Sequence, residues 1–240
     1  MRAVAADALL APLREAPGRS ALVFDVDGTL APIVARPALA SVPESTRAEL
    51  ARLERRYLLV ACVSGRAGDD AARLVGVPGV TVVGNHGLEL VPDADNFRAR
   101  MARFRDAVGL VVEDKGLSLS YHYREAPDER AARAQLEKVA ALARDEGLDP
   151  RWGRKVLEIR PAVAADKGTA VRSLLERSGA IRGLYAGDDT TDLDAFAGLA
   201  GLEHAVRIAV ASDEGPRDLT AAADLVVPGA GALAELLRLL

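Results

Sequence analysis

Short apolar runs that alternate with helical patterns constrain the fold of this chain more than any other feature. The apolar runs occupy residues 22–24, 58–63, 80–83, 183–186, 206–210 and 225–227, and helical patterns fall at 43–56, 69–75, 167–178 and 192–200. This alternation is typical of strand–helix–strand units, which build a parallel sheet. The sequence therefore predicts an α/β protein with a parallel-sheet, Rossmann-like core.

Residues 88–163 interrupt that rhythm. They contain a strictly alternating apolar and polar segment at 117–124, a long helical pattern at 128–146 and a further apolar run at 156–160. Strict alternation is typical of a half-buried strand. We therefore expect two domains: a core formed by residues 1–87 and 164–240, and a small inserted α/β cap, residues 88–163, that determines substrate specificity.

Composition narrows the possible functions. The 240 residues carry a formal net charge of −4 and no basic surplus, which argues against nucleic acid as a partner. No stretch approaches the roughly 20 apolar residues of a membrane span. The apolar N-terminal run ends at Arg14 and Glu15, which favours a short amphipathic helix over a signal peptide. The single cysteine, Cys62, lies in an apolar run and indicates a buried thiol in a cytoplasmic protein.

Two aspartates, Asp25 and Asp27, come directly after the first apolar run. Since side chains alternate along a strand, residues two apart leave its carboxyl end on the same side. In an open α/β sheet, ligands bind at that edge. An Asp–Gly turn is also common in α/β proteins without catalytic activity, so the pair indicates chemistry only together with other motifs.

A serine and a lysine fall where a parallel sheet would bring them to the same edge. Ser64 follows the second apolar run and could donate its hydroxyl to a phosphate oxygen, while Gly65 would let the backbone approach. Lys167 begins a helical pattern and could hold negative charge. Each signal is weak alone, because Ser–Gly turns and solvated lysines are common.

Three carboxylates, Asp188, Asp189 and Asp192, follow the apolar run 183–186. At this spacing they repel one another unless a cation lies among them, and hard oxygen ligands suit Mg²⁺. The alternative is that one of them caps the following helix.

Taken in order, these motifs resemble the haloacid-dehalogenase superfamily of phosphohydrolases: DVDGT at 25–29, then Ser64, Lys167 and GDDTTD at 187–192. The resemblance implies a hydrolase core in which Asp25 is the nucleophile and forms an aspartyl-phosphate. Asp27 would be the general acid and then the general base. Ser64 and Lys167 would hold the phosphoryl oxygens.

The same resemblance implies a magnesium site. The ligands would be the Asp25 carboxylate, the Asp27 backbone carbonyl and Asp188. Asp189 and Asp192 would support the metal site, and the sequence does not decide which of the two lies closer to the ion. A phosphate monoester carries about −1.5 to −2 charge, so a carboxylate nucleophile must be screened before it can attack.

A narrower family, the trehalose-6-phosphate phosphatases, resembles the chain from residue 21 to about residue 210. The matching segments are DVDGTLAPIV at 25–34, GNHG at 84–87, EDKGLSLSYHYR at 113–124, KVLEIRP at 155–161 and YAGDDTTDLDAF at 185–196. This resemblance implies that Lys155 and Glu158 bind the disaccharide from the cap. The other substrate-binding residues would be Gly65, Arg66, Asn85, His86 and Arg124. Strict alternation puts Lys155 and Glu158 on opposite faces of a strand, so we expect Lys155 in the turn before it.

The resemblance implies hydrolysis of trehalose 6-phosphate to trehalose and phosphate. Three alternatives remain: a phosphatase for glucosyl- or mannosyl-phosphoglycerate or sucrose phosphate, a sugar phosphomutase, and a non-catalytic sugar-phosphate sensor. The sequence contains no glycosyltransferase domain, so a separate trehalose-phosphate synthase would supply the substrate. The oligomeric state stays open, with a monomer favoured.

Overall fold

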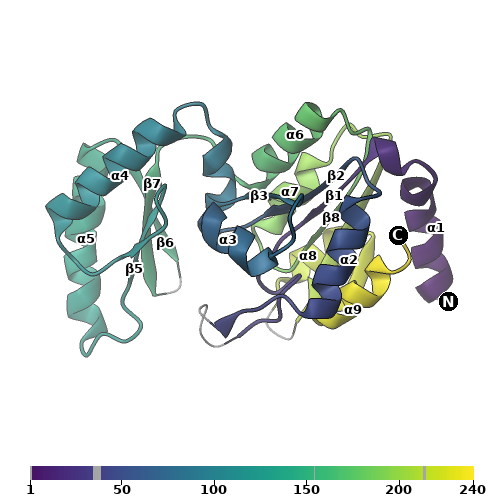
Figure 1. The fold of residues 1–240 in the computed structure, drawn as a ribbon. Helices are drawn as coiled ribbons and strands as arrows, with labels where there is room; N and C mark the ends of the chain where they lie inside the picture. The colour runs from purple at the N-terminus through teal and green to yellow at the C-terminus, as the bar shows by residue number, and fades with distance from the viewer. Residues whose placement is uncertain (1, 35–38, 154, 213–214) are drawn as a thin grey trace. The chain divides into compact units, whose positions relative to one another are not determined.

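The computed structural model describes residues 2–34, 39–153, 155–212 and 215–240 (Figure 1). The chain divides into two compact units. The core unit comprises Met1–Leu90 and Ala165–Leu240, and the inserted unit comprises Val91–Ala164.

The core unit is built on a parallel sheet whose strand order is β10-β9-β8-β1-β2-β3. Its strands are β1 (Ser20–Phe24), β2 (Leu59–Val63), β3 (Thr81–Val83), β8 (Arg182–Gly187), β9 (His204–Ala211) and β10 (Leu225–Pro228). Each of them overlaps one of the predicted apolar runs. Since β1 is flanked by β2 on one side and β8 on the other, the strand order reverses at β1, which is where open α/β sheets bind ligands.

Helices cover both faces of this sheet, and the alternation within β1 shows how. Leu22 and Phe24 pack with α1 (Arg2–Glu15), α2 (Glu44–Glu54) and α9 (Gly229–Leu237). The intervening Ala21 and Val23 pack with α6 (Lys167–Ser178), α7 (Asp192–Gly198) and α8 (Arg217–Ala222). Continuous apolar strands are typical of parallel sheets covered on both faces.

Shorter elements complete the core unit. They are η1 (Pro17–Arg19), α3 (Gly68–Val75) and η3 (Asn85–Leu90). Both α3 and η3 follow strands at the carboxyl edge of the sheet, so their first residues lie where the candidate site is expected.

The inserted unit contains a four-stranded antiparallel sheet of order β4-β5-β7-β6. Its elements are α4 (Ala94–Val108), β4 (Glu113–Asp114), β5 (Leu119–His122), α5 (Glu129–Asp145), β6 (Leu148–Gly153) and β7 (Val156–Pro161). Leu119 and Tyr121 of β5 are buried against apolar side chains of α4 and α5, including Met101 and Leu136. The apolar half of the alternating segment therefore faces the helices.

The predicted α/β class, a parallel sheet with a small α/β insertion, is confirmed. The interpretation of the insertion as a cap that selects the substrate stays a prediction. No helix in the described residues is both long enough and apolar enough to cross a membrane.

Candidate active site

The carboxyl edge of the core sheet brings several of the predicted side chains to adjacent strand ends. Asp25 follows β1, and its backbone N–H donates to Ala186 of β8 at 2.9 Å. Ser64 follows β2, and its N–H donates to Val83 of β3 at 2.9 Å. Because Phe24 pairs with Cys62 in the sheet register, Asp25 and Ser64 leave neighbouring strands at nearly the same level.

The ammonium group of Lys167 is buried between two carboxylates. Its Nζ lies 2.8 Å from Asp25 Oδ1 and 2.7 Å from Asp192 Oδ1, and its side chain is 3% exposed. Lys167 is the first residue of α6, and a reciprocal capping box between Asp166 and Thr169 fixes that helix start. The helix cap therefore sets the position from which Lys167 reaches Asp25.

Asp192 is fully buried, and its carboxylate orients the turn that carries Asp188. Its Oδ2 accepts hydrogen bonds from the backbone N–H groups of Asp188 and Asp189, each at 2.8 Å. Its Oδ1 accepts from the Tyr185 hydroxyl at 2.7 Å as well as from Lys167. With both oxygens engaged, Asp192 acts here mainly as a support for its neighbours.

Asp188 lies against the loop that follows Asp25. Its Oδ1 accepts a hydrogen bond from the Thr29 hydroxyl at 3.1 Å. Gly28 has φ +82°, and a Cβ there would lie 2.0 Å from Asp188 Oδ2. Glycine is therefore required at this position both by the backbone conformation and by the close approach of the carboxylate. Asp189, by contrast, is exposed and accepts from the N–H of Thr190 in its own turn at 2.7 Å.

The electrostatics of the cluster favour added positive charge. Burial raises the pKa of Asp25 to about 8; the Lys167 ammonium acts to lower it, and the charge of Asp192 raises it further. Burial and the charge of Asp192 raise the pKa of Asp188 to about 6. The pKa of Lys167 also rises, because attraction to Asp25 and Asp192 outweighs the effect of burial. Lys167 thus stays charged but compensates only one of the three carboxylates.

The residues present fit a divalent metal ion. One carboxylate oxygen from each of Asp25, Asp188 and Asp192 lies within 4.8 Å of the other two. When all three are ionised, Lys167 leaves two negative charges, which a divalent cation would balance. Hard oxygen donors of this kind suit Mg²⁺.

Asp27, the predicted proton donor and acceptor, is held by Arg66. The guanidinium donates from Nε to Asp27 Oδ2 and from Nη2 to Oδ1, both at 2.6 Å. Two parallel charge-assisted hydrogen bonds of this kind are both strong and directional. The sequence predicted Arg66 as a substrate-binding residue but gave no indication of its pairing with Asp27.

The loop after β3 places two further predicted residues. The backbone N–H of His86 donates to Ser64 O at 2.9 Å, and a Cβ on Gly65 would lie 2.6 Å from His86 Nε2. His86 thus lies over the Ser64–Gly65 turn. Asn85 is 1% exposed, and its side-chain amide donates a hydrogen bond to Glu89 at 3.2 Å. In this structure Asn85 is therefore buried against Glu89 of its own loop.

The remaining predicted residues belong to the inserted unit, and its sheet separates them. Glu158 lies on the face of β7 opposite the helices and pairs in register with Ser120 of β5. Lys155 lies in the turn before β7, as expected, with φ +64°. Its Nζ forms an ion pair with Glu129 at the start of α5. Arg124 is exposed in the turn after β5. Lys155 therefore lies beside the start of α5, whereas Glu158 lies on the face of the sheet opposite the helices.

Two charged residues that the sequence analysis did not single out join Glu158 on its face. Lys115 Nζ lies 3.9 Å from Glu158 Oε1, and Glu113 Oε2 lies 2.8 Å from His122 Nε2. We call Glu113, Lys115, His122 and Glu158 the polar face of the inserted unit. The alternating polar positions of residues 117–124 indicated that one face of this strand is polar. The sequence did not indicate Glu113 and Lys115, because β4 is too short to be predicted from periodicity.

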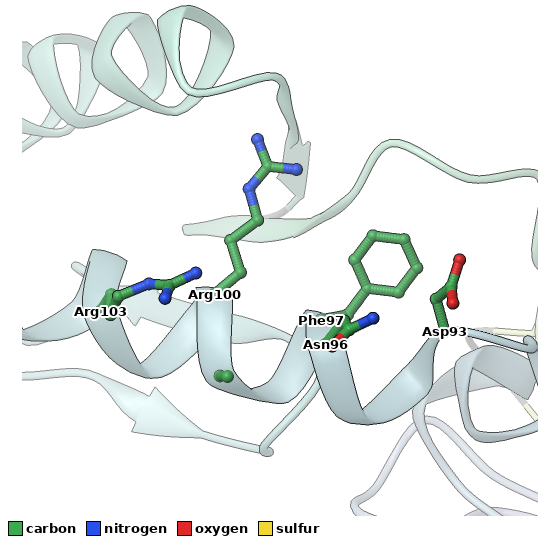
Figure 2. A pocket seen from close by; sticks show the side chains of 6 residues that line it. Asp93, Asn96, Phe97, Arg100 and Arg103 are labelled. Carbon is green, nitrogen blue, oxygen red and sulfur yellow. The ribbon is translucent and has the colours of Figure 1, made fainter.

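Two hollows of the inserted unit are lined wholly or partly by residues of its helices. One, of about 340 Å³, runs along α4 and is lined by Asp93, Asn96, Phe97, Ala99, Arg100 and Arg103, of which Figure 2 labels all but Ala99. Another, of about 550 Å³, is lined by Lys155 together with Tyr123, Glu129, Arg130, Arg133 and Gly153. Only Lys155 among the predicted site residues lines either of these two hollows.

A family model and several curated relatives indicate one family. A model of the family described as trehalose-phosphatase matches residues 23–102 and 94–226. The trehalose-phosphate phosphatase of Mycobacterium avium (strain 104) is 37% identical over 203 residues, which cover 75% of this chain and 51% of the relative. A probable trehalose-phosphate phosphatase 4 from Oryza sativa subsp. japonica is 33% identical over 205 residues, covering 75% of this chain and 55% of the relative. The chain thus spans about half the length of these relatives.

Solved structures share the fold. A crystal structure of a trehalose-6-phosphate phosphatase related protein matches with a TM-score of 0.72 at 23% identity, covering 91% of this chain and 95% of the other. The C-terminal domain of the Candida albicans trehalose-6-phosphate phosphatase matches with a TM-score of 0.70 at 21% identity, covering 97% and 96%. At such identities the likeness establishes the fold alone.

Proposed function

The chain belongs to the trehalose-phosphatase family, and from that premise we propose that it is a magnesium-dependent phosphatase. Its substrate is trehalose 6-phosphate, which it hydrolyses to trehalose and phosphate through an aspartyl-phosphate on Asp25. The observation that carries the proposal is the buried group of Asp25, Asp188, Asp192 and Lys167 at the strand edge. Burying three carboxylates is costly, and a site for a metal ion and a phosphoryl group explains why they are there.

In the first step, an Asp25 carboxylate oxygen attacks phosphorus, and the bond between phosphorus and the sugar oxygen breaks. Asp27 gives its proton to that leaving oxygen. Proton transfer of this kind typically contributes about 10²- to 10⁴-fold to the rate. Ser64 and Lys167 hold the remaining phosphoryl oxygens and compensate their charge.

In the second step, water attacks the aspartyl-phosphate, Asp27 accepts a proton from that water, and the bond between phosphorus and Asp25 breaks. Asp27 must therefore alternate between its protonated and ionised forms. In the structure the guanidinium of Arg66 occupies both carboxylate oxygens of Asp27. This pair must therefore open before Asp27 can exchange a proton, and the doubly charged phosphate of the substrate offers Arg66 another partner.

Asp25, the Asp27 backbone carbonyl and Asp188 would hold a magnesium ion. The ion would act as a Lewis acid and compensate the negative charge of the phosphoryl oxygens. Asp192 supports this arrangement through the backbone N–H groups of Asp188 and Asp189. The exposed Asp189 is the weaker candidate for a direct ligand.

The inserted unit is proposed as the cap that recognises the sugar. Its polar face carries both acidic and basic side chains, which suit the hydroxyl groups of a disaccharide because each hydroxyl can donate and accept a hydrogen bond. Glu158 on this face is the best supported sugar ligand. Lys155 would first have to leave Glu129.

A separate trehalose-phosphate synthase would supply the substrate, and the enzyme would act in the cytoplasm. A cytoplasmic location suits the single cysteine, Cys62, which is a fully buried free thiol.

The test is a panel of phosphate esters assayed for release of inorganic phosphate with Mg²⁺ and with EDTA. The panel contains trehalose 6-phosphate, sucrose phosphate, glucosyl- and mannosyl-phosphoglycerate, and p-nitrophenyl phosphate. We expect trehalose 6-phosphate to give the highest kcat/KM and EDTA to abolish its turnover. A different preferred sugar phosphate would contradict the substrate assignment, turnover that survives EDTA would contradict the metal, and an isomeric sugar phosphate without free phosphate would indicate a mutase.

A further inference from the structure

Two loops at the strand edge, residues 64–68 after β2 and residues 84–87 after β3, are fastened to each other through the backbone. The N–H of Asn85 donates to Arg66 O at 2.7 Å, and the N–H of His86 donates to Ser64 O at 2.9 Å. The first loop carries the proposed phosphate-holding serine and the partner of Asp27. The second places His86 over it. These two backbone hydrogen bonds therefore fix how Ser64, Arg66 and His86 lie relative to one another.

A single carboxylate, that of Glu89 in η3, lies between these loops and binds both. Its Oε1 accepts from the backbone N–H of Gly68 at 2.8 Å and from the amide of Asn85 at 3.2 Å. Its Oε2 accepts from the backbone N–H of Gly84 at 2.9 Å. Gly68 is the first residue of α3, so the carboxylate also meets the positive end of a helix dipole.

The loop that Glu89 binds is held in an unfavourable conformation. Asn85 and His86 have φ values of +52° and +53°, in the left-handed region that side chains other than glycine rarely adopt. Such a conformation persists only when the surroundings of the residue fix it. The hydrogen bonds of Glu89 and of the two backbone N–H groups provide that constraint.

The close packing of the two loops around the carboxylate also explains two glycines. A Cβ on Gly68 would lie 2.2 Å from Glu89 Oε2, so a larger residue there displaces the carboxylate. A Cβ on Gly84 would lie 2.2 Å from the backbone nitrogen of Gly68 and 2.7 Å from Glu89 Oε1, so a larger residue there pushes the two loops apart.

We propose that Glu89 is a positioning residue, which sets the Ser64–Arg66 turn and the Asn85–His86 turn at the separation that the reaction needs. The expected loss of turnover rests on the proposed function, whereas the hydrogen bonds of Glu89 do not depend on it. Glu89 acts through Ser64, Arg66 and His86. A displacement of these groups by about 1 Å lowers turnover by about 10²-fold.

The experiment compares the wild type with Glu89→Gln and with Glu176→Gln, a matched substitution of an exposed residue on α6. The amide that Glu89→Gln introduces cannot accept from both Gly68 and Gly84, because an NH₂ donor replaces one of the two oxygens. We expect kcat with trehalose 6-phosphate and with p-nitrophenyl phosphate to fall about 10- to 100-fold in Glu89→Gln, assayed at a temperature at which the variant is fully folded. Glu176→Gln should behave as the wild type.

Amide resonances in ¹H–¹⁵N spectra provide a second measurement that needs no activity. Those of Arg66 and His86, whose N–H groups do not touch Glu89, should shift in Glu89→Gln and not in Glu176→Gln. Unchanged resonances at these two residues, or turnover equal to the wild type, would overturn the inference. If the wild type hydrolyses no ester, the proposed function fails, whereas the resonances still decide the role of Glu89.

A further variant reaches the same carboxylate without altering it. Gly68→Ala places a methyl group where Glu89 Oε2 now lies, while alanine at the first position of α3 is otherwise compatible with a helix. Should Glu89→Gln fail to fold, Gly68→Ala is expected to give the same loss of kcat and the same resonance shifts. A folded Gly68→Ala protein with wild-type kcat and resonances would count against the proposal.

Discussion

Both units of the chain carry clusters of acidic and basic side chains, but they bury them to different extents. In the core unit, the side chains of Asp25, Lys167 and Asp192 are 7%, 3% and 0% exposed. On the polar face of the inserted unit, His122 and Glu113 are 59% and 49% exposed, and Lys115 and Glu158 are 19% and 20% exposed. Acidic and basic side chains therefore lie in a low-dielectric environment in the core unit and nearer to water on the polar face.

This difference suits different tasks. A buried ion pair is held rigidly, and removing one partner leaves an uncompensated charge. An exposed pair costs little to form and little to break. The core unit thus has a fixed charge arrangement, which suits the proposed reaction centre, whereas the more exposed side chains of the polar face can rearrange, which suits the proposed binding of a sugar.

The largest expected effect comes from changing the proposed nucleophile. Asp25→Asn keeps the shape of the side chain but removes the attacking oxygen, so phosphate release from trehalose 6-phosphate should fall at least about 10³-fold. The fold should persist, because Asp25→Asn also removes one of three crowded carboxylates. Wild-type turnover in this variant would exclude an aspartyl-phosphate on Asp25.

The next prediction concerns stability. Lys167→Met leaves Asp25 and Asp192 buried without their cation, and the free energy of unfolding should fall by about 3–5 kcal/mol, measured by urea denaturation without added metal. Burial raises the pKa of Asp25, and losing Lys167 raises it further, so the folded variant favours the protonated carboxyl. The folded wild type releases this proton near pH 8, whereas the folded variant keeps it, and the unfolded chain is ionised in both proteins. The loss should therefore be larger at about pH 9 than at about pH 6.

A double substitution sharpens this prediction. Asp25→Asn combined with Lys167→Met should lose less stability than Lys167→Met alone, because one uncompensated carboxylate is gone. Equal losses in the two proteins would mean that the charges of the core site do not interact as their geometry indicates.

The core site could be predicted from the sequence to a large extent, for a physical reason. Asp25, Ser64 and Asp188 each follow an apolar run, and a parallel sheet brings the carboxyl ends of its strands to one edge. Local signals therefore sufficed to place them. The partners of these groups could not be predicted in the same way, because contacts between side chains of different loops leave no periodic trace.

Arg66 and Glu89 illustrate this limit. The sequence gives no sign that Arg66 holds Asp27, 39 positions away, or that Glu89 binds Gly68, 21 positions away. In the inserted unit, periodicity predicted the apolar face of β5 and the turn position of Lys155, but not the ion pair of Lys155 with Glu129. That pairing depends on how α5 packs against the sheet.

A smaller effect is expected on the polar face. Glu158→Gln should raise KM for trehalose 6-phosphate about tenfold, since a charged acceptor is lost, and leave KM for p-nitrophenyl phosphate unchanged because that ester has no sugar. Stability should change little, since the Glu158 ion pair with Lys115 is long, at 3.9 Å. Equal KM increases for both esters would place Glu158 in the phosphate site instead of the sugar site.

The smallest effect is expected on the helices of the inserted unit. Glu137 and Arg133 form an ion pair of 3.5 Å on α5, with side chains 62% and 54% exposed. Glu137→Gln should change the free energy of unfolding by less than about 0.5 kcal/mol, and salt should reduce even that, because water screens the pair. Arg133 keeps its position over the Trp152 ring, 4.8 Å from the ring centroid. A loss above about 1 kcal/mol would show that exposed charges in this unit are held as tightly as the buried charges of the core, and the contrast between the two units would then fail.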